Sequence, residues 1–129
     1  MKNGLLNILF IGLLFLFSQK SYAETITGKA VSIQILDKVT SKIENITIDV
    51  GDSFIFGTIK IKVFLCKKRP PEEVPEDFVL IRIFDETSLG KFEKIFQGWM
   101  ISSSPSITPF EHPTYDVWVK DCKINLDSE

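Results

Sequence analysis

Hydrophobic and polar residues alternate along most of the chain that follows residue 30. Val31, Ile33 and Ile35 are separated by Ser32 and Gln34, and the same period of two returns in later segments. Strict alternation that uses β-branched residues is typical of half-buried β-strands. The pattern therefore predicts strands over residues 31–35, 46–50, 59–65, 78–84, 91–100 and 115–121.

The segments between these strands carry turn and loop signals. Turns are expected at residues 37–42, 51–52 and 85–90. Gly57 predicts a bulge or a sharp bend. The prolines gather in residues 67–77 and 102–113, and both segments are expected to be loops because proline cannot donate to a strand ladder. No amphipathic helix is predicted after residue 23, so the expected fold is all-β, a small antiparallel sandwich or a partly open barrel.

The N-terminus has the layout of a cleavable signal peptide. Lys2 supplies a short positive start, and Leu5 to Phe17 is a mainly apolar run of 13 residues. Small residues at Ser21 and Ala23 place the expected cleavage between Ala23 and Glu24. A membrane anchor is the alternative, but a spanning helix needs about 20 apolar residues. We therefore expect a signal peptide over residues 1–23 and export of the remaining chain.

Removal of the signal peptide would leave a single β-rich domain over residues 24–129, long enough to bury a modest core. The chain has 15 basic and 17 acidic residues, a net charge of −2, and loss of Lys2 and Lys20 makes the remainder more acidic. Because nucleic-acid binding relies on basic patches that contact phosphates, no nucleic-acid partner is expected. The basic run at residues 67–69 is followed at once by acidic residues, which predicts a solvated loop.

Cys66 and Cys122 are the two cysteines of the chain, and their positions differ by 56 residues. Exported domains fold in an oxidising compartment, where such a pair normally forms a disulfide. Closing a loop of this length would stabilise the fold by about 4 kcal/mol in the chain-entropy model. Two separate buried thiols are the alternative. A zinc site with His112 is disfavoured because the spacing matches no compact ligand motif, and no metal or cofactor is expected.

Side-chain parity predicts where this disulfide lies. Successive side chains of a strand point to opposite faces. If Val63 faces the core, Cys66 faces away from it together with Phe64, and Cys122 likewise shares a face with Trp118. We therefore expect the disulfide on the reverse face, in a second apolar cluster with Phe64 and Trp118. A bulge in either strand would overturn this expectation.

Several separated motifs of the chain resemble one family. They are Phe56-Gly57-Thr58-Ile59, Cys66-Lys67-Lys68-Arg69-Pro70-Pro71-Glu72, Gly98-Trp99-Met100, Ser103-Ser104-Pro105 and Glu111-His112-Pro113-Thr114-Tyr115-Asp116-Val117-Trp118. In this order they resemble the bacterial Domain of Unknown Function 2155 family, which consists of small exported proteobacterial proteins. The resemblance covers about Val31 to Cys122. It implies a secreted or periplasmic domain with no assigned activity, and it carries over no catalytic residue.

His112 is the single histidine and the first candidate for chemistry. As a general base it would need an orienting carboxylate, Glu111 or Asp116, and a nucleophile among the serines at 102–104. Pro113 holds this segment extended, where neighbouring side chains point apart, so Glu111 is badly placed. No Gly-x-Ser-x-Gly motif is present. We expect a structural or loop histidine and no enzyme activity, and a pH-sensing or partner-sensing role is the remaining option.

Aromatic and sulfur-containing side chains near the C-terminal half suggest a binding surface. Tyr, Trp and Met are favoured at protein interfaces, and exposed apolar patches are often functional. Core packing is the alternative in a chain that has 11 phenylalanines. Together with one loop arginine, the candidate surface comprises Arg69, Trp99, Met100, His112, Tyr115 and Trp118.

These observations favour an exported periplasmic domain that binds or scaffolds other components of the cell envelope without catalysis. The expected partner is an envelope protein, with membrane contact only through an uncleaved signal segment. One alternative is a small envelope hydrolase that uses His112 and a loop serine. Another alternative is an accessory or assembly factor of an inner-membrane complex.

Overall fold

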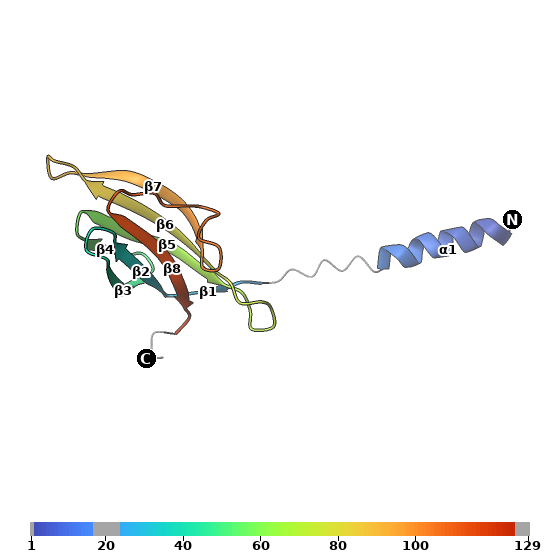
Figure 1. Cartoon of the computed structure of the whole chain (residues 1–129). Coiled ribbons are helices and arrows are strands. Elements are labelled where there is room, and N and C mark those ends of the chain that lie inside the picture. The colour runs from blue at the N-terminus through green and yellow to red at the C-terminus, as the bar shows by residue number, and fades with distance from the viewer. Residues whose placement is uncertain (1, 17–23, 126–129) are drawn as a thin grey trace.

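The computed structural model describes residues 2–16 and 24–125 and confirms the all-β class of the domain (Figure 1). Helix α1 (Lys2–Leu16) precedes the domain. The strands are β1 (Ile26–Thr27), β2 (Ala30–Asp37), β3 (Lys42–Asp49), β4 (Ser53–Phe56), β5 (Ile59–Lys68), β6 (Asp77–Glu86), β7 (Phe92–Ile101) and β8 (Tyr115–Lys123). Alternation predicted all of these except β1 and β4, which are too short to show a period of their own.

The strands form two antiparallel sheets that enclose one core, as Figure 1 shows. The larger sheet has five strands in the order β1-β5-β6-β7, with β4 also paired to β5. The smaller sheet has three strands in the order β3-β2-β8. The sandwich is open rather than a closed barrel, because β7 and β8 are the outer strands of separate sheets.

The core is made by the inward positions of both sheets. Alternate residues along β2, β5 and β6 have no exposed surface, as the period of two predicts. These include Ile33, Ile35, Ile59, Ile61, Ile81 and Ile83. The residues between them are half-buried and point outward.

The connection between β4 and β5 is a tight turn that requires glycine. Gly57 has a φ of 55°, in the left-handed region where a side chain is strained. A Cβ at this position would also lie 2.0 Å from the hydroxyl oxygen of Tyr115. The sharp bend expected at Gly57 is therefore confirmed, and it lets β8 approach this turn.

Two β-bulges reverse the expected orientation of both cysteines. Phe64 is the extra residue on β5, and Lys120 is the extra residue on β8. Each insertion shifts the alternation by one position. Cys66 and Cys122 therefore both point into the core, where neither has exposed surface.

The predicted disulfide is present and joins the two sheets through the core. Its Cα atoms lie 5.9 Å apart, one on β5 and the other on β8. The expected reverse-face cluster is wrong, because Phe64 and Trp118 lie on the outer faces of different sheets. The expectation that Trp118 stays outside the main core holds, since Trp118 is half-buried and paired with Gln34 on β2.

In the described part of the chain, no helix has the length and apolar character needed to span a membrane. The expected cleavage point after Ala23 lies outside the described residues, as do residues 126–129. Processing and the exact extent of the domain therefore stay predictions.

Candidate binding surface

The outer face of the five-stranded sheet carries basic and aromatic side chains in alternation. Strand pairing sets them side by side, since Lys60 pairs with Phe84 and Lys62 pairs with Arg82. On the next strand, Lys94 pairs with Phe84. We call this surface the basic–aromatic face, and its members are Lys60, Lys62, Phe64, Lys67, Arg69, Phe78, Leu80, Arg82, Phe84, Phe92, Lys94 and Trp99.

Most cations of this face lie over an aromatic ring. Lys60 Nζ is 4.8 Å from the ring centroid of Phe84 and 4.5 Å from that of Phe92, and the guanidinium of Arg82 is 4.8 Å from that of Phe64. The further pairs are Lys62 with Phe64, Arg69 with Phe78 and Arg82 with Phe84. Each such contact contributes about 0.5–1 kcal/mol at an exposed site. The stacking holds the charged groups in place and covers the ring faces.

Few carboxylates neutralise these cations. Among the described residues, one cation of the face has an ion pair: Arg69 Nε lies 4.0 Å from Glu73 Oε2. Lys67 donates to the Thr27 hydroxyl, and Arg82 donates to the side-chain oxygen of Gln97. The face is therefore positive on a chain whose net charge is −2. Such charge segregation favours encounters with negatively charged partners.

His112 lies elsewhere, buried at the end of the sandwich where β6 finishes. Its Nε2 is 3.2 Å from Asp85 Oδ2, and its Nδ1 accepts the backbone N–H groups of Thr114 and Tyr115, both at 3.1 Å. These contacts assign the ring proton to Nε2, which donates to Asp85. The orienting carboxylate is thus Asp85, and neither Glu111 nor Asp116 has this role.

Aromatic rings enclose His112 on both sides. Phe110 stacks on it with ring centroids 5.9 Å apart, and Tyr115 stacks on it at 5.3 Å. Burial raises the pKa of Asp85, but hydrogen bonds from Thr58 and His112 outweigh this effect, so that the pKa is lowered overall. The geometry is that of a structural joint between β6 and the segment that leads into β8.

The serines expected to partner His112 lie at the other end of β6. Ser102 donates from its hydroxyl to Glu76 Oε1 at 3.0 Å, and Ser103 also donates to Glu76. The Ser102 N–H bonds to the carbonyl of Asp77. Asp77 and Asp85 are separated by about 26 Å at the usual rise of a strand. The histidine–serine pair of the hydrolase alternative is therefore not assembled.

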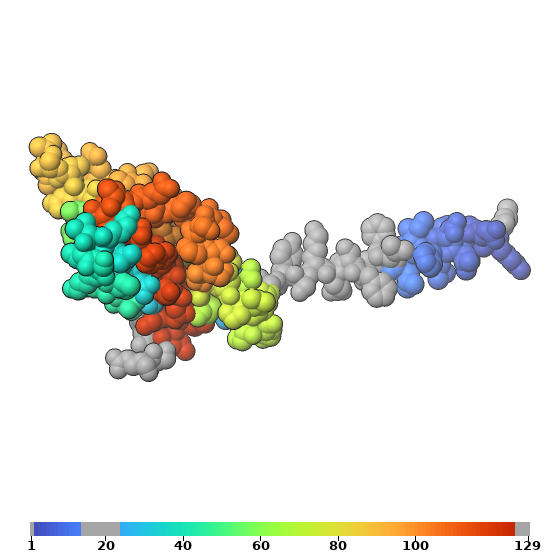
Figure 2. Space-filling model, viewed as in Figure 1, coloured from blue at the N-terminus to red at the C-terminus, as the bar shows by residue number. Residues whose placement is uncertain are grey.

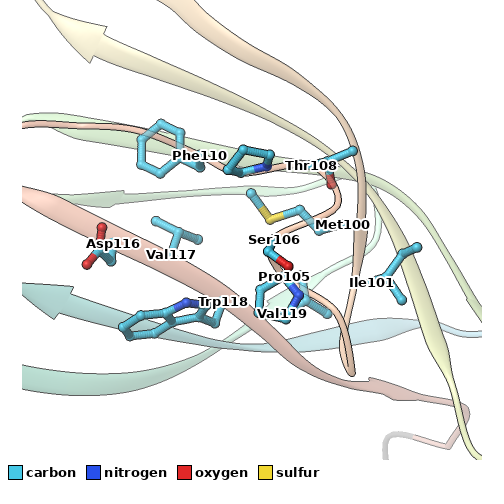
Figure 3. A pocket seen from close by; sticks show the side chains of 11 residues that line it. Met100, Ile101, Pro105, Ser106, Thr108, Phe110, Asp116, Val117, Trp118 and Val119 are labelled. Carbon is cyan, nitrogen blue, oxygen red and sulfur yellow. The ribbon is translucent and has the colours of Figure 1, made fainter.

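A cleft lies between β8 and the segment from residue 102 to residue 114 (Figure 3). Its volume is about 280 Å³, and most of its lining is apolar, with Met100, Pro105 and Trp118 among the residues. Asp116 is the charged residue of the lining, and it already pairs with Lys38 at 3.3 Å. Within residues 2–16 and 24–125, no cluster of three or more possible metal ligands occurs.

The predicted binding residues do not form one surface. Arg69 and Trp99 belong to the basic–aromatic face, and Trp99 is 41% exposed. Met100 and Tyr115 are buried, as the core-packing alternative required, and His112 is buried as well. Trp118 lies on the outer face of the other sheet. The prediction of a shared exposed surface is corrected accordingly.

The basic–aromatic face could not be seen as a run of charge in the sequence. Its cations come from different strands and occupy alternate positions. In the sequence, this pattern is visible only at Lys60 and Lys62, which alternate with the buried Ile59 and Ile61. The contiguous run was expected in a solvated loop, but Lys67 and Lys68 belong to β5. Lys68 is neutralised there, because its Nζ lies 2.6 Å from Asp121 and 3.6 Å from Asp77. The hydrogen bond to Asp121 raises the pKa of Lys68, and burial raises the pKa of Asp77.

Comparisons with known proteins agree with the resemblance that the motifs indicated. A family model described as "Uncharacterized protein conserved in bacteria (DUF2155)" matches residues 31–122. The chain belongs to the DUF2155 family. The matched region of the DUF2155 domain includes all of β5, β6 and β7, the strands that carry most of the basic–aromatic face.

One curated relative is also similar to this DUF2155 chain. "Uncharacterized protein RP359" from Rickettsia prowazekii (strain Madrid E) is 38% identical over 95 residues. The alignment covers 74% of this chain and 59% of that protein, so the chain spans less than two thirds of its relative. No solved structure matches the chain.

Proposed function

We propose that the chain is exported and that its β-domain is a non-catalytic binding or scaffold module of the cell envelope. In this proposal the basic–aromatic face contacts a negatively charged partner. The observation that carries the proposal is the concentration of cations such as Lys60, Lys62 and Arg82 on one face of an acidic protein.

The geometry of the face favours binding over chemistry. Lys60 and Arg82 stack on aromatic rings, so less side-chain entropy is lost when a partner immobilises them. The sheet beneath is fixed to the second sheet by the Cys66–Cys122 disulfide. These features supply a rigid charged platform, whereas the hydrolase alternative needed a contact between His112 and a serine that is not assembled.

The accessory-factor alternative is a special case of this proposal. It requires that α1 is retained and that the anionic partner belongs to an inner-membrane complex. Leu5, Leu6 and Phe10 of α1 are each at least 66% exposed, so a retained α1 would offer an apolar contact of its own. The mass of the N-terminus in envelope extracts separates the two cases.

The test compares two variants that lose the same charge from different sheets. The face variant is Lys60→Gln, Lys62→Gln and Arg82→Gln, on β5 and β6. The matched control is Lys29→Gln, Lys120→Gln and Lys123→Gln, on or beside the three-stranded sheet. Urea unfolding first checks that each variant is folded.

We expect the wild-type protein and the control to fractionate with exported envelope material at low salt, and the face variant to lose this association. Retention of the face variant would contradict the assigned surface. Recovery of the wild-type protein from the cytoplasm would contradict export itself.

A further inference from the structure

We infer that the basic–aromatic face docks on the surface of a bilayer that contains anionic phospholipids. This inference rests on the proposed function and names its partner. Three features of the face carry it, namely the spread of its cations, the covered ring faces and the exposed apolar side chains among the charges.

The cations extend over the length of the sheet instead of surrounding one depression. Lys67 and Arg69 lie where β5 ends, whereas Lys94 lies near the start of β7, with Lys62 and Arg82 paired between them. Strands of this length span about 33 Å. An extended negative surface can meet all of these charges at once, while a single small anion would meet only a few. Each basic residue near an anionic leaflet adds to the attraction.

The covered rings argue against single-stranded nucleic acid as the partner. Proteins of that class stack bases on open aromatic side chains. Here Lys60 lies over Phe84 and Phe92, and Arg82 lies over Phe64. A base could stack on these rings only by displacing the cation above them. Phosphate groups of lipids need the cations alone.

Exposed apolar side chains lie next to these charges. Trp99 is 41% exposed, and Ile55, paired with Lys60, is 57% exposed. At the tip of the β6–β7 hairpin, which projects from the domain at the upper left of Figure 2, Leu89 is 82% exposed. Tryptophan favours the membrane interface, where headgroups border the acyl chains. A surface that mixes cations with such residues matches that zone.

The test measures co-sedimentation with vesicles of phosphatidylcholine, either alone or mixed with phosphatidylglycerol. It uses protein purified from exporting cells together with the face variant and its matched control, all with the same N-terminus. We expect binding to the mixed vesicles only, weakened by about fivefold for each neutralised cation and so by roughly a hundredfold in the face variant. Raising the salt from about 0.1 M to 1 M should also release the protein, because the Debye length falls from about 10 Å to 3 Å.

Trp99 provides a second readout that folding defects do not imitate. In a Trp118→Phe background, its fluorescence should shift to shorter wavelength when phosphatidylglycerol vesicles are added. Brominated lipids should then quench it. The same spectrum with and without these vesicles would overturn the lipid inference.

Two other outcomes would also overturn the inference. One is a wild-type protein that ignores the mixed vesicles, and the other is tighter binding to single-stranded oligonucleotide or polyglutamate at the same salt. In either case the proposed function survives if the face variant alone loses envelope association. If the face variant keeps that association as well, both proposals fail.

Discussion

Gly28 touches the disulfide so closely that no side chain fits at this position. A Cβ there would lie 2.2 Å from Sγ of Cys122 and 2.4 Å from Sγ of Cys66. The Gly28 N–H also donates to the carbonyl of Cys66 at 3.0 Å, which fixes its backbone beside the bridge. Glycine is required here because the backbone lies so close to the disulfide, and no pattern in the sequence predicts this contact.

Gly28→Ala should therefore destabilise the domain by about 1–3 kcal/mol, the usual cost of overpacking a core. Urea unfolding of the oxidised protein measures the change. Gly98→Ala is the control, because a Cβ at Gly98 meets only the ring of Phe96 at an ordinary 3.5 Å. Equal stabilities of the two variants would show that β1 moves away from the disulfide at little cost.

The pair formed by His112 and Asp85 links residue chemistry to acid stability. The pKa of Asp85 is lowered below its ordinary value of 3.8 when the chain is folded. The unfolded chain then binds the proton more tightly. The stabilisation is thus complete above pH 3.8 and is lost as the pH falls through the folded pKa.

Asp85→Asn keeps an oxygen that can accept from His112 but removes the titrating group. We expect its stability to fall less than that of the wild-type protein as the pH drops below 3.8, measured by urea midpoints. The variant should still lose some stability in acid, because the pKa of Glu76 is lowered as well. Hydrogen bonds from Ser103 and Ser102 outweigh the effect of burial on that carboxyl group. Parallel curves for the two proteins would contradict a role of Asp85 in the acid transition.

At the scale of elements, alternation predicts the strands but not the bulges inside them. The long strands can be recognised from the sequence because Ile and Val fill their inward positions. The extra residues Phe64 and Lys120 carry no such mark, although each inverts the side on which the following cysteine lies. The pairing of the cysteines was predictable from their number and from the expected export, whereas the position of the disulfide depends on the strand register.

The same limit applies to the candidate binding surface. Lys60 and Lys62 can be read as outward positions of one strand, but Arg82 and Lys94 join them only through strand pairing. Charge that is assembled across strands has no signature in a linear sequence. The kind of aromatic residue did not predict exposure either, since Tyr115 is buried and Trp99 is exposed.

Reduction of the disulfide removes the covalent link between β5 and β8, which belong to different sheets, and should destabilise the domain. We expect a loss of about 2–5 kcal/mol on reduction, as for native bridges in small exported domains. Before reduction, the native protein should show no thiol reactive to alkylation, and the monomer should migrate faster on non-reducing gels. A Cys66→Ala, Cys122→Ala variant gives the reduced reference. Two freely alkylated cysteines in the native protein would show that the bridge does not form.

At the scale of the whole molecule, two joints hold the sheets together at opposite ends of β8. Before its first residue, His112 bonds to Asp85 of β6. Near its last residue, Cys122 is joined to Cys66 of β5, and Asp121 pairs with Lys68. Both joints lie on the inner side of the five-stranded sheet. Neither contact uses the outer side of this sheet, which carries the basic–aromatic face.

The placement of the first strand makes export processing compatible with this architecture. Cleavage after Ala23 would remove α1 and leave every described strand whole, since β1 begins at Ile26. Glu24 and Thr25 are exposed. We expect intact mass analysis of periplasmic extract to find a chain that begins at Glu24. Ala23→Leu should block cleavage, because signal peptidase requires a small residue there. A wild-type chain that still begins at Met1 in washed membranes would show that α1 is retained, and α1 would then add a membrane contact to the one inferred for the basic–aromatic face.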